Sequence, residues 1–418
     1  MAGVSPLWLR RILRVLFEQR QAGRSELARA TGLDSDSLDR ALRHLLQCGL
    51  VRHLGPTRRA IGRPREELAL EAEGGYLVAV DLEGTRVRFG VTNLLAEVRY
   101  RWEEPVACGT RFDMRTFARG VEKVLKNLTP GQQSRVIAMG VSYSGVIDRE
   151  GRITAVNLGW RDFPLEQEIA CVADLPFFLG SESFVKLLAE HWQGAARSSS
   201  NCIFVQVGNG VGFAGLVNGH PIRGRDGNAG EIGHITVDPA APDRCNCGKT
   251  GCLEAIASSP NIVRQYLELA GRSLPKVLLG EQVIEVFHRA RNEDRAALTV
   301  IDRAARYLGL ALAHAANLLN PEVIVLGGDL IHAADLFLPR IRAELARHVL
   351  PAIHASLEVR ISALGFDSGL IGAACLAFHE VLREPALLDR LLSAPHLRAA
   401  SQTATESVGN RRLRAARA

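Results

Sequence analysis

Residues 231–254 read EIGHITVDPAAPDRCNCGKTGCLE, which gathers one imidazole and three thiols into a short span. The four groups belong to His234, Cys245, Cys247 and Cys252. The Cys-x-Cys-x4-Cys spacing, with glycines at 248 and 251, lets a short loop fold its sulfurs around one ion. Three thiolates and one imidazole form a closed tetrahedral donor set, which is typical of structural zinc. We therefore predict a zinc-stapled loop, and the alternative is a group of unrelated reduced cysteines.

The remaining cysteines do not suggest disulfides. The chain has eight, and the five outside this loop are scattered singly, mostly in apolar runs. A chain of 418 residues does not need disulfides to fold, so we expect a reducing, cytoplasmic setting. No apolar run reaches the roughly 18–20 residues that a membrane helix needs, so no membrane partner is expected. The Arg-rich start imitates a transit peptide, but its spacing predicts an amphipathic first helix. The inward residues of that helix are Leu9, Ile12, Leu13 and Leu16.

The regions flanking the loop indicate an α/β body. From Tyr76 onward, short apolar runs such as YLVAVDL, RVRFGVTN, RVIAMGVS, CIFVQVG and VIVLGG alternate with helical stretches. This alternation is typical of α/β architecture. No sequence repeat of about 20–50 residues is visible, which argues against a solenoid.

The first part of the chain has the spacing of a helix-turn-helix. Residues 24–51 read RSELARATGLDSDSLDRALRHLLQCGLV. Ser25 is the expected N-cap of one helix, Gly32 allows a tight turn, and a second helix is expected from about Ser35. Leu27 and Leu38 should then meet in a small core while the second helix turns its other face outward.

Charge supports a polyanion partner for this head. Residues 1–66 hold 13 Lys/Arg and 6 Asp/Glu, a net +7, and the last 19 residues are +3, which leaves −4 for the rest of the +6 chain. The stretch GPTRRAIGRPRE resembles a cationic wing. Three aspartates near the start of the second helix repel phosphates, which leaves the operator sequence open. The expected DNA-contacting residues are Arg40, Arg43, His44, Arg58, Arg59, Arg63 and Arg65.

The loop and its flanks resemble the ROK family (repressors, open reading frames and sugar kinases). The family pattern is roughly GxxGxAGEIGH followed by CxCGxxGCLE, and residues 227–254 match it almost unchanged. NLGWRDFPLEQEI (157–169), NPEVIVLGGDL (320–330) and SGLIGAACLAF (368–378) also look like family segments. The resemblance implies an α/β bilobal actin/hexokinase-like (ribonuclease H-like) body with an N-terminal all-α winged helix-turn-helix domain.

The resemblance also suggests where the domains lie. We expect the head at 1–66, a linker at 67–75, a first lobe at 76–185 completed by 363–385, and a second lobe at 186–362. The second lobe would carry the zinc loop and an oligomer interface. Residues 395–418 are small, polar and basic, and are expected to be a disordered tail.

The resemblance implies that the kinase motifs are degenerate. Family kinases use Asp-x-Gly-Gly-Thr to approach phosphate, but this chain has Glu83 at the third position. Asn209 replaces the Thr of the second phosphate loop, which is a milder change. The Asn-Asp pair that supplies the general base falls on Ser181 and Glu182, and the longer side chain displaces the carboxylate by about 1 Å. Gly327-Gly328 is retained, and we do not expect an enzyme.

The sugar side of the site is better preserved. By resemblance, the effector-binding residues are Asn157, Glu182, Glu231, His234 and Glu254. The alternative role of Glu231 is to cap a helix beside the zinc loop. An ordinary, phosphorylated or acetylated sugar, no effector, and a protein regulator all remain open.

The reading that follows is a sugar-responsive DNA-binding regulator of the repressor type. Its partners would be double-stranded operator DNA and a sugar or sugar derivative, and it would be a homodimer or homotetramer that holds zinc. The alternatives are an active sugar kinase with a DNA-binding appendage and an interaction scaffold.

Overall fold

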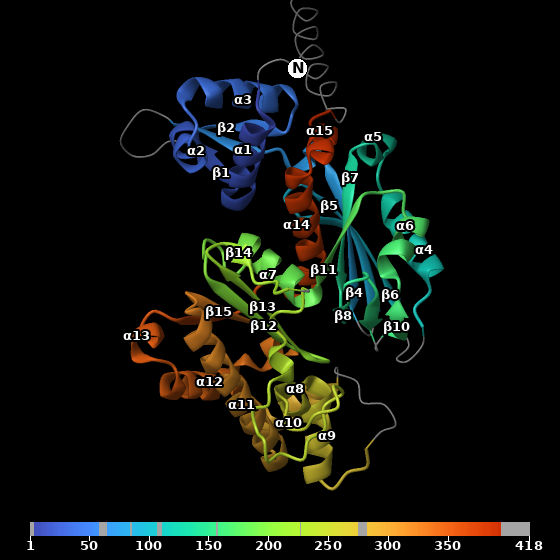
Figure 1. Ribbon diagram of the computed structural model, residues 1–418, viewed down its shortest axis with the longest axis vertical. Helices are drawn as coiled ribbons and strands as arrows, with labels where there is room; N and C mark the ends of the chain where they lie inside the picture. The colour runs from blue at the N-terminus through green and yellow to red at the C-terminus, as the bar shows by residue number, and fades with distance from the viewer. Residues whose placement is uncertain are drawn as a thin grey trace, which may run out of the picture.

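The computed structural model describes residues 4–57, 65–83, 86–106, 111–155, 158–225, 227–274 and 282–393. A small head packs on a body of two lobes, each built around a five-stranded sheet (Figure 1). The expected tail, 395–418, lies outside the described residues. None of the helices in the described ranges has both the length and the hydropathy that a membrane-spanning segment requires.

The head combines three helices with a small antiparallel sheet, so the expectation of an all-α domain is wrong. Its strands pair in the order β1-β3-β2, because the chain after the third helix returns as a β-hairpin. Its elements are α1 (Pro6–Gln19), β1 (Gln21–Gly23), α2 (Arg24–Thr31), α3 (Ser35–Gln47), β2 (Val51–Thr57) and β3 (Arg65–Leu70). The tip of the hairpin, residues 58–64, lies outside the described residues.

The turn between α2 and α3 forms as its residues suggest. Gly32 adopts a left-handed conformation with φ of 68° and donates its N–H to Ala28 O, which ends α2. Asp34 then caps α3 by accepting from Ser37 N at 2.8 Å. The expected cap at Ser25 is wrong, because α2 begins at Arg24 and Gly23 N donates to the Glu26 carboxylate at 3.0 Å. The apolar residues Leu9, Ile12, Leu13, Leu16, Leu27 and Leu38 are all buried.

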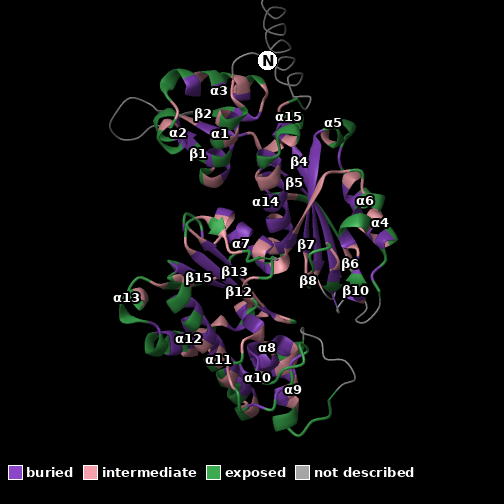
Figure 2. Cartoon of the chain, viewed as in Figure 1, coloured by how far each residue is buried: buried purple, intermediate pink, exposed green. Residues whose placement is uncertain are grey.

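The first lobe buries both faces of its sheet (Figure 2). Leu77 and Ala79 pack toward the returning helix α14 (Ser368–Arg383). Val78 and Val80 pack toward α4 (Met114–Leu125) and α6 (Leu165–Val172) on the other face. The sheet order is β11-β7-β4-β5-β6, with β7 and β11 parallel and the β4–β5–β6 meander antiparallel. These elements are β4 (Tyr76–Glu83), β5 (Arg86–Asn93), β6 (Val98–Pro105), α4 (Met114–Leu125), α5 (Pro130–Gln133), β7 (Val136–Tyr143), α6 (Leu165–Val172), β11 (Phe177–Ser181) and α15 (Pro385–Ser393). A small sheet joins β8 (Val146–Ile147), β9 (Ile153–Ala155) and β10 (Trp160–Phe163).

The second lobe repeats the strand order of the first. Its order β14-β13-β12-β15-β16 again places an antiparallel hairpin beside parallel strands. The strands are β12 (Cys202–Val207), β13 (Val211–Val217), β14 (His220–Pro221), β15 (Val323–Gly328) and β16 (Glu358–Ile361). The helices are α8 (Leu253–Ala257), α9 (Ser259–Leu269), α10 (Val283–Arg291), α11 (Arg295–Leu319), α12 (Ala334–His348) and α13 (Pro351–His354). This repeated topology is typical of the actin/hexokinase-like fold.

Helix α7 (Glu182–Gln193) lies between the two lobes. A Cβ added to Gly212 of β13 would meet Ser183 Oγ at 2.1 Å, and one added to Gly372 of α14 would meet Val185 O at the same distance. These close approaches show that α7 packs tightly against both lobes.

The head and the first lobe share one hydrophobic core. The Phe17 ring of α1 packs edge-on against Trp192 of α7, with centroids 4.9 Å apart, and lies 4.7 Å from Phe378 of α14. Arg20 also donates to Leu95 O at 3.1 Å. The expected linker, 67–75, is therefore wrong in part: β3 belongs to the head sheet through Leu70, and the short η1 helix (Ala72–Gly74) leads directly into β4.

Candidate functional site

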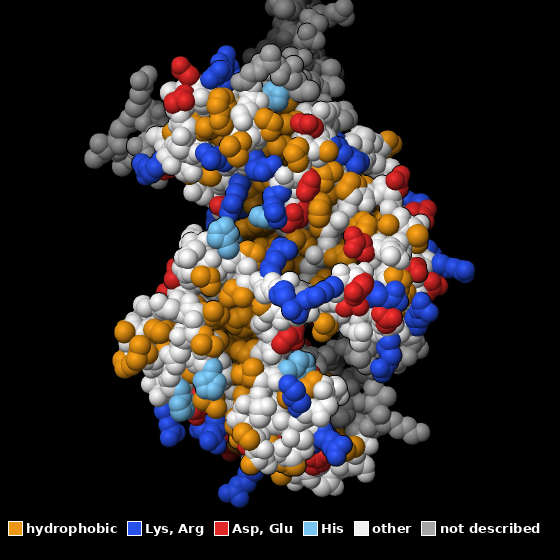
Figure 3. Space-filling model, viewed as in Figure 1, with side chains coloured by type: hydrophobic (Ala, Val, Ile, Leu, Met, Phe, Trp, Pro, Cys, Tyr) orange, Lys and Arg blue, Asp and Glu red, His pale blue; other side chains and the backbone are white. Residues whose placement is uncertain are grey.

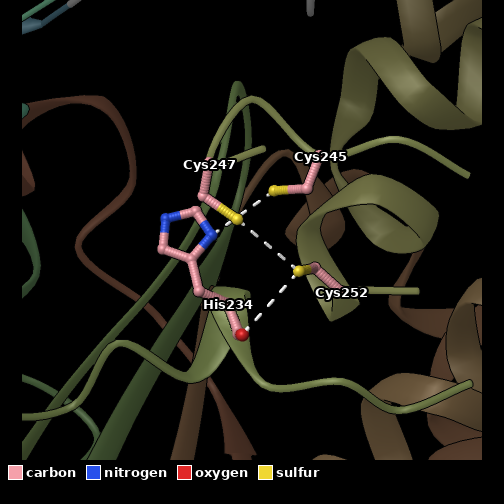
Figure 4. A group of neighbouring side chains, drawn as sticks. All are labelled: His234, Cys245, Cys247 and Cys252. Carbon is pink, nitrogen blue, oxygen red and sulfur yellow. Dashed lines mark hydrogen bonds between the residues drawn. The ribbon is translucent and has the colours of Figure 1, made fainter. Parts of the chain in front are cut away.

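The four expected metal ligands come together beside the second sheet (Figure 4). His234 ends the short helix η3 (Ile232–His234), Cys252 precedes α8, and Cys245 and Cys247 lie on the loop between them. His234 Nδ1 is 3.4 Å from Cys245 Sγ, and Cys247 Sγ is 3.7 Å from Cys252 Sγ. All four ligand atoms lie within 4.8 Å of one another. Gly251 makes this turn possible, because its φ is 69° and a Cβ there would meet Asp238 O at 1.9 Å.

These distances fit one tetrahedral ion. With Zn–S bonds of about 2.3 Å, neighbouring sulfurs of a tetrahedron should be about 3.8 Å apart, and a sulfur and a nitrogen slightly less. Without an ion, burial raises the pKa of the Cys245 thiol to about 12 and raises that of Cys252, whereas the Lys249 backbone N–H lowers the pKa of Cys247. A bound cation would hold these groups as thiolates, releasing protons as it bound.

The metal loop is tied to the helices behind it. Asp243, which is buried, accepts from Arg264 of α9 at 2.8 Å and from Arg303 of α11 at 2.6 Å. Burial opposes its ionisation, but the two guanidinium groups hold the pKa of Asp243 below its usual value. Tyr307 of α11 donates to Asp238 at 2.5 Å. These contacts orient the loop and hence the residues that flank it.

Two carboxylates predicted to contact sugar flank the metal cluster. Glu231 Oε2 is 3.9 Å from His234 Nε2, on the side of the ring opposite the sulfurs. Glu231 precedes η3, but its carboxylate makes no capping hydrogen bond and its side chain is 53% exposed, which disfavours the helix-capping alternative. Burial raises the pKa of Glu231, with His234 opposing and Glu254 adding to the shift. Glu254 accepts from Val211 N at 3.0 Å and so contacts the turn that begins β13.

The residues at the kinase positions are engaged in ion pairs. Glu182, which the resemblance places at the general base, accepts from Lys186 Nζ at 2.6 Å, and both side chains are nearly buried. Burial opposes ionisation, but Lys186 holds the pKa of Glu182 below its usual value. Glu83, at the end of β4, pairs with Arg88. Asn157, the remaining predicted sugar contact, lies outside the described residues.

Sequence reasoning missed three charged residues here: Lys186, Arg88 and Asp329. Lys186 follows Glu182 by four residues on a helix, a spacing that itself indicates an ion pair. Arg88 is the cross-strand neighbour of Asp81 in the β4–β5 pair. Asp329 directly follows the retained Gly327-Gly328, where it accepts from Ser259 Oγ at 2.7 Å.

The predicted DNA-contacting residues fall into three groups. Arg43 is exposed on α3, and Arg40 is exposed but stacks on Trp8 at 5.4 Å. His44 is half-buried, with Nε2 3.7 Å from Cys48 Sγ. Arg65 begins β3, but its side chain is not described, and Arg58, Arg59 and Arg63 lie outside the described residues.

One of the aspartates on α3 is paired within the head. Asp39 forms an ion pair with Arg24 of α2, and Asp34 is used as the helix cap. The acidic character of this helix is thereby partly neutralised. Elsewhere, the recess between the head and the second lobe shows Lys, Arg and His side chains together with Asp or Glu and hydrophobic ones (Figure 3).

Comparisons with known proteins place this geometry in context. The model described as the ROK family matches residues 77–380. A glucokinase of Halalkalibacterium halodurans is 35% identical over 312 residues, which cover 72% of this chain and 94% of the enzyme. The N-acetylglucosamine repressor of Escherichia coli O6:H1 is 29% identical over 393 residues, covering 91% of this chain and 94% of the repressor. The solved structure of a ROK family transcriptional regulator, described as a homolog of the E. coli MLC protein, gives a TM-score of 0.76 at 25% identity and covers 93% of this chain and 98% of its own.

Proposed function

This chain belongs to the ROK family, and we propose on that premise that it is a sugar-responsive transcriptional regulator of the repressor type. The observation that carries the proposal is the head. A family regulator structure covers 93% of the chain, so the similarity extends beyond the kinase-like body to a helix-turn-helix with a β-hairpin. The order α1-β1-α2-α3-β2-β3 is consistent with a winged helix-turn-helix. In that motif the second helix of the helix-turn-helix, here α3, would enter the major groove.

We infer that DNA would be contacted by the outward face of α3 and by the segment that joins β2 to β3. Arg43, with Arg40 and His44 beside it, would face base edges, whereas Arg58, Arg59, Arg63 and Arg65 would contact phosphates or the minor groove. A homodimer or homotetramer in the cytoplasm would present two heads to a pseudo-palindromic operator.

The body would hold the effector. Glu231 and Glu254 would accept hydrogen bonds from sugar hydroxyls, with His234, Glu182 and Asn157 as further contacts. Zinc would be held by His234 and the three cysteines, and it would supply structural cross-linking by fixing the loop that carries Glu231. Sugar would shift the protein between two states only through its different affinity for them.

A second candidate function is sugar phosphorylation, which the 35% identity to a glucokinase favours. The charges at the phosphate side weigh against it. Glu83 puts a carboxylate where the family places glycine, and the Glu182 carboxylate is bound to Lys186 and held in its ionised form, so it is a weaker proton acceptor. Repressor-named relatives that cover about nine-tenths of the chain also favour a protein that is not an enzyme.

The decisive experiment measures binding of the full chain to the promoter upstream of its own gene by fluorescence anisotropy. Arg43→Ala should weaken that binding by about 5- to 150-fold, from the roughly 1–3 kcal/mol of a base contact, while binding to random duplex changes little. Arg115→Ala is the matched control, because Arg115 is an exposed arginine on α4 of the body. If the unmodified chain binds promoter and random DNA with equal affinity, with and without sugars, the proposal that it regulates this promoter is refuted.

A further inference from the structure

On the first-lobe side of the proposed sugar site, the positive charge of Arg88 is already balanced by neighbouring carboxylates. Arg88 is only 6% exposed, pairs with Glu83 and lies 3.6 Å from Asp81 Oδ2. It also donates to Phe366 O, and its guanidinium lies 4.2 Å from the centroid of that ring. Both Asp81 carboxylate oxygens are buried and, among the described residues, have no hydrogen-bond partner. The positive charge of Arg88 is therefore shared between two carboxylates and is not free for an anionic ligand.

Lys186, like Arg88, is already paired with a carboxylate. Its ammonium is 2.6 Å from Glu182, and its side chain is only 9% exposed. It also acts electrostatically on Asp329, across from the first lobe. A buried ammonium that already serves carboxylates on both sides would have to give up these partners to accept a phosphate.

The second-lobe side of the site adds two more acidic residues, Asp329 and Glu254. The turn Gly208–Gly210 lies between them: a Cβ on Gly208 would be 3.8 Å from Asp329 Oδ2, and a Cβ on Gly210 would be 2.7 Å from Glu254 Oε2. Glu254 also occupies Val211 N, a backbone donor at the end of this turn. A phosphate that approached the turn would face carboxylates on both sides of it.

The charges do not cancel. Asp81, Glu83, Glu182 and Asp329 are four carboxylates against the two cations Arg88 and Lys186, which leaves a formal −2 before Glu254 is counted. Burial raises the pKa of Asp329, and with that one group protonated the sum is still −1. The formal charge of these six groups is thus negative in either protonation state of Asp329.

We infer that the effector of this chain is a sugar without a phosphate group, and that the pocket rejects the phosphate ester of the same sugar. The inference rests on the proposed sugar response and narrows its ligand class. A sugar phosphate carries about −1.5 to −2 charges at neutral pH, because its second pKa is near 6. Placed beside a net negative, largely desolvated site, it meets repulsion that a neutral hydroxyl does not. A hydroxyl, in contrast, can donate to these carboxylates.

The test compares matched pairs of ligands on the full chain loaded with zinc. D-glucose and N-acetylglucosamine are each titrated beside their 6-phosphate esters, which keep the same pyranose ring, with thermal shift as a screen and calorimetry for Kd. For the sugar that binds, the ester should bind at least about tenfold more weakly, which corresponds to the 1.4 kcal/mol of one decade. The difference should shrink at high ionic strength, because screening weakens repulsion.

Charge variants identify the source of the rejection. Glu83→Gln should reduce the discrimination between sugar and ester several-fold. Glu122→Gln is the control, because Glu122 pairs with Lys126 on α4, which packs on the sheet face opposite to Arg88. An ester that binds as tightly as its parent sugar overturns the inference. So does rejection that Glu83→Gln and Asp329→Asn both leave unchanged. A panel in which neither sugars nor esters bind refutes the proposed sugar response itself, which is a different result.

Discussion

Phe17→Ala would test whether the head and the body are one folding unit. Phe17 is 2% exposed at the C-terminal end of α1, and its ring packs against Trp192 and Phe378 of two body helices. Removing this ring leaves a cavity at the centre of the shared core. Leu7→Ala is the control on the same helix, because Leu7 is 48% exposed.

The expected cost follows from the burial of the ring. Transfer of a Phe side chain out of water contributes about 1.5–3 kcal/mol, and the cavity that remains adds to the loss. Core Phe→Ala substitutions typically cost about 3–5 kcal/mol, and the lost aromatic pairing belongs to that range. The control should change the free energy of unfolding by less than about 0.5 kcal/mol.

The assay is urea unfolding of the full chain, followed by far-UV circular dichroism and by tryptophan fluorescence. If the head and the body share one core, Phe17→Ala should lower the urea midpoint for unfolding of the body as well as for unfolding of the head. A variant whose body transition stays unchanged while only a small head transition moves would refute the reasoning, because it would show a head that folds independently. A total loss below about 1 kcal/mol would refute it as well.

Three further outcomes are expected. Purified protein never exposed to chelator should hold about one zinc per chain by emission spectrometry, and Cys247→Ser should lower its melting temperature; metal-free protein of equal stability would contradict this. Sugar-dependent ADP formation should not exceed that of Glu182→Ala, and a clear excess would restore the kinase reading. Burial, aided by nearby arginines, lowers the pKa of His379 from 6.5 to about 4, so the unfolded chain binds the proton first and stability falls as the pH drops from about 6.5 toward 4. The free energy of unfolding should fall by about 3 kcal/mol at most over this pH range, and by less in His379→Gln. Identical profiles of unfolding free energy against pH for the two proteins would contradict this prediction.

Local patterns predicted the elements of the fold well. The helix spacing around Gly32 and the buried leucines of the head are as expected, because those signals lie within one turn or one helix face. The small sheet was missed because β1 has only three residues, Gln21–Gly23, and pairs with a strand more than 40 residues away. The repeated strand order of the two lobes was equally invisible, since topology can repeat without sequence similarity.

The site shows the same division. The metal ligands were predictable because all four lie in the short stretch from His234 to Cys252 and are residue types that structural zinc uses. The charge balance at the phosphate side was not, because it depends on pairs such as Arg88 with Asp81, whose contact requires the β4–β5 register. From the sequence, Glu83 indicated only a poor phosphate loop, whereas the structure shows that its carboxylate pairs with Arg88.

The direct packing of the head on the body also limits which spacings of two operator half-sites the protein could bind. Each added base pair rotates one half-site by about 34° and moves it about 3.4 Å, since a turn holds about 10–10.5 base pairs. A head on a flexible tether follows such a change at little cost. Here the Phe17–Trp192–Phe378 cluster and the Arg20 hydrogen bond to Leu95 O hold the head in one orientation. In the proposed oligomer, insertion of a single base pair would therefore demand either distortion of the DNA or separation of an aromatic core, and the permitted spacing is narrow.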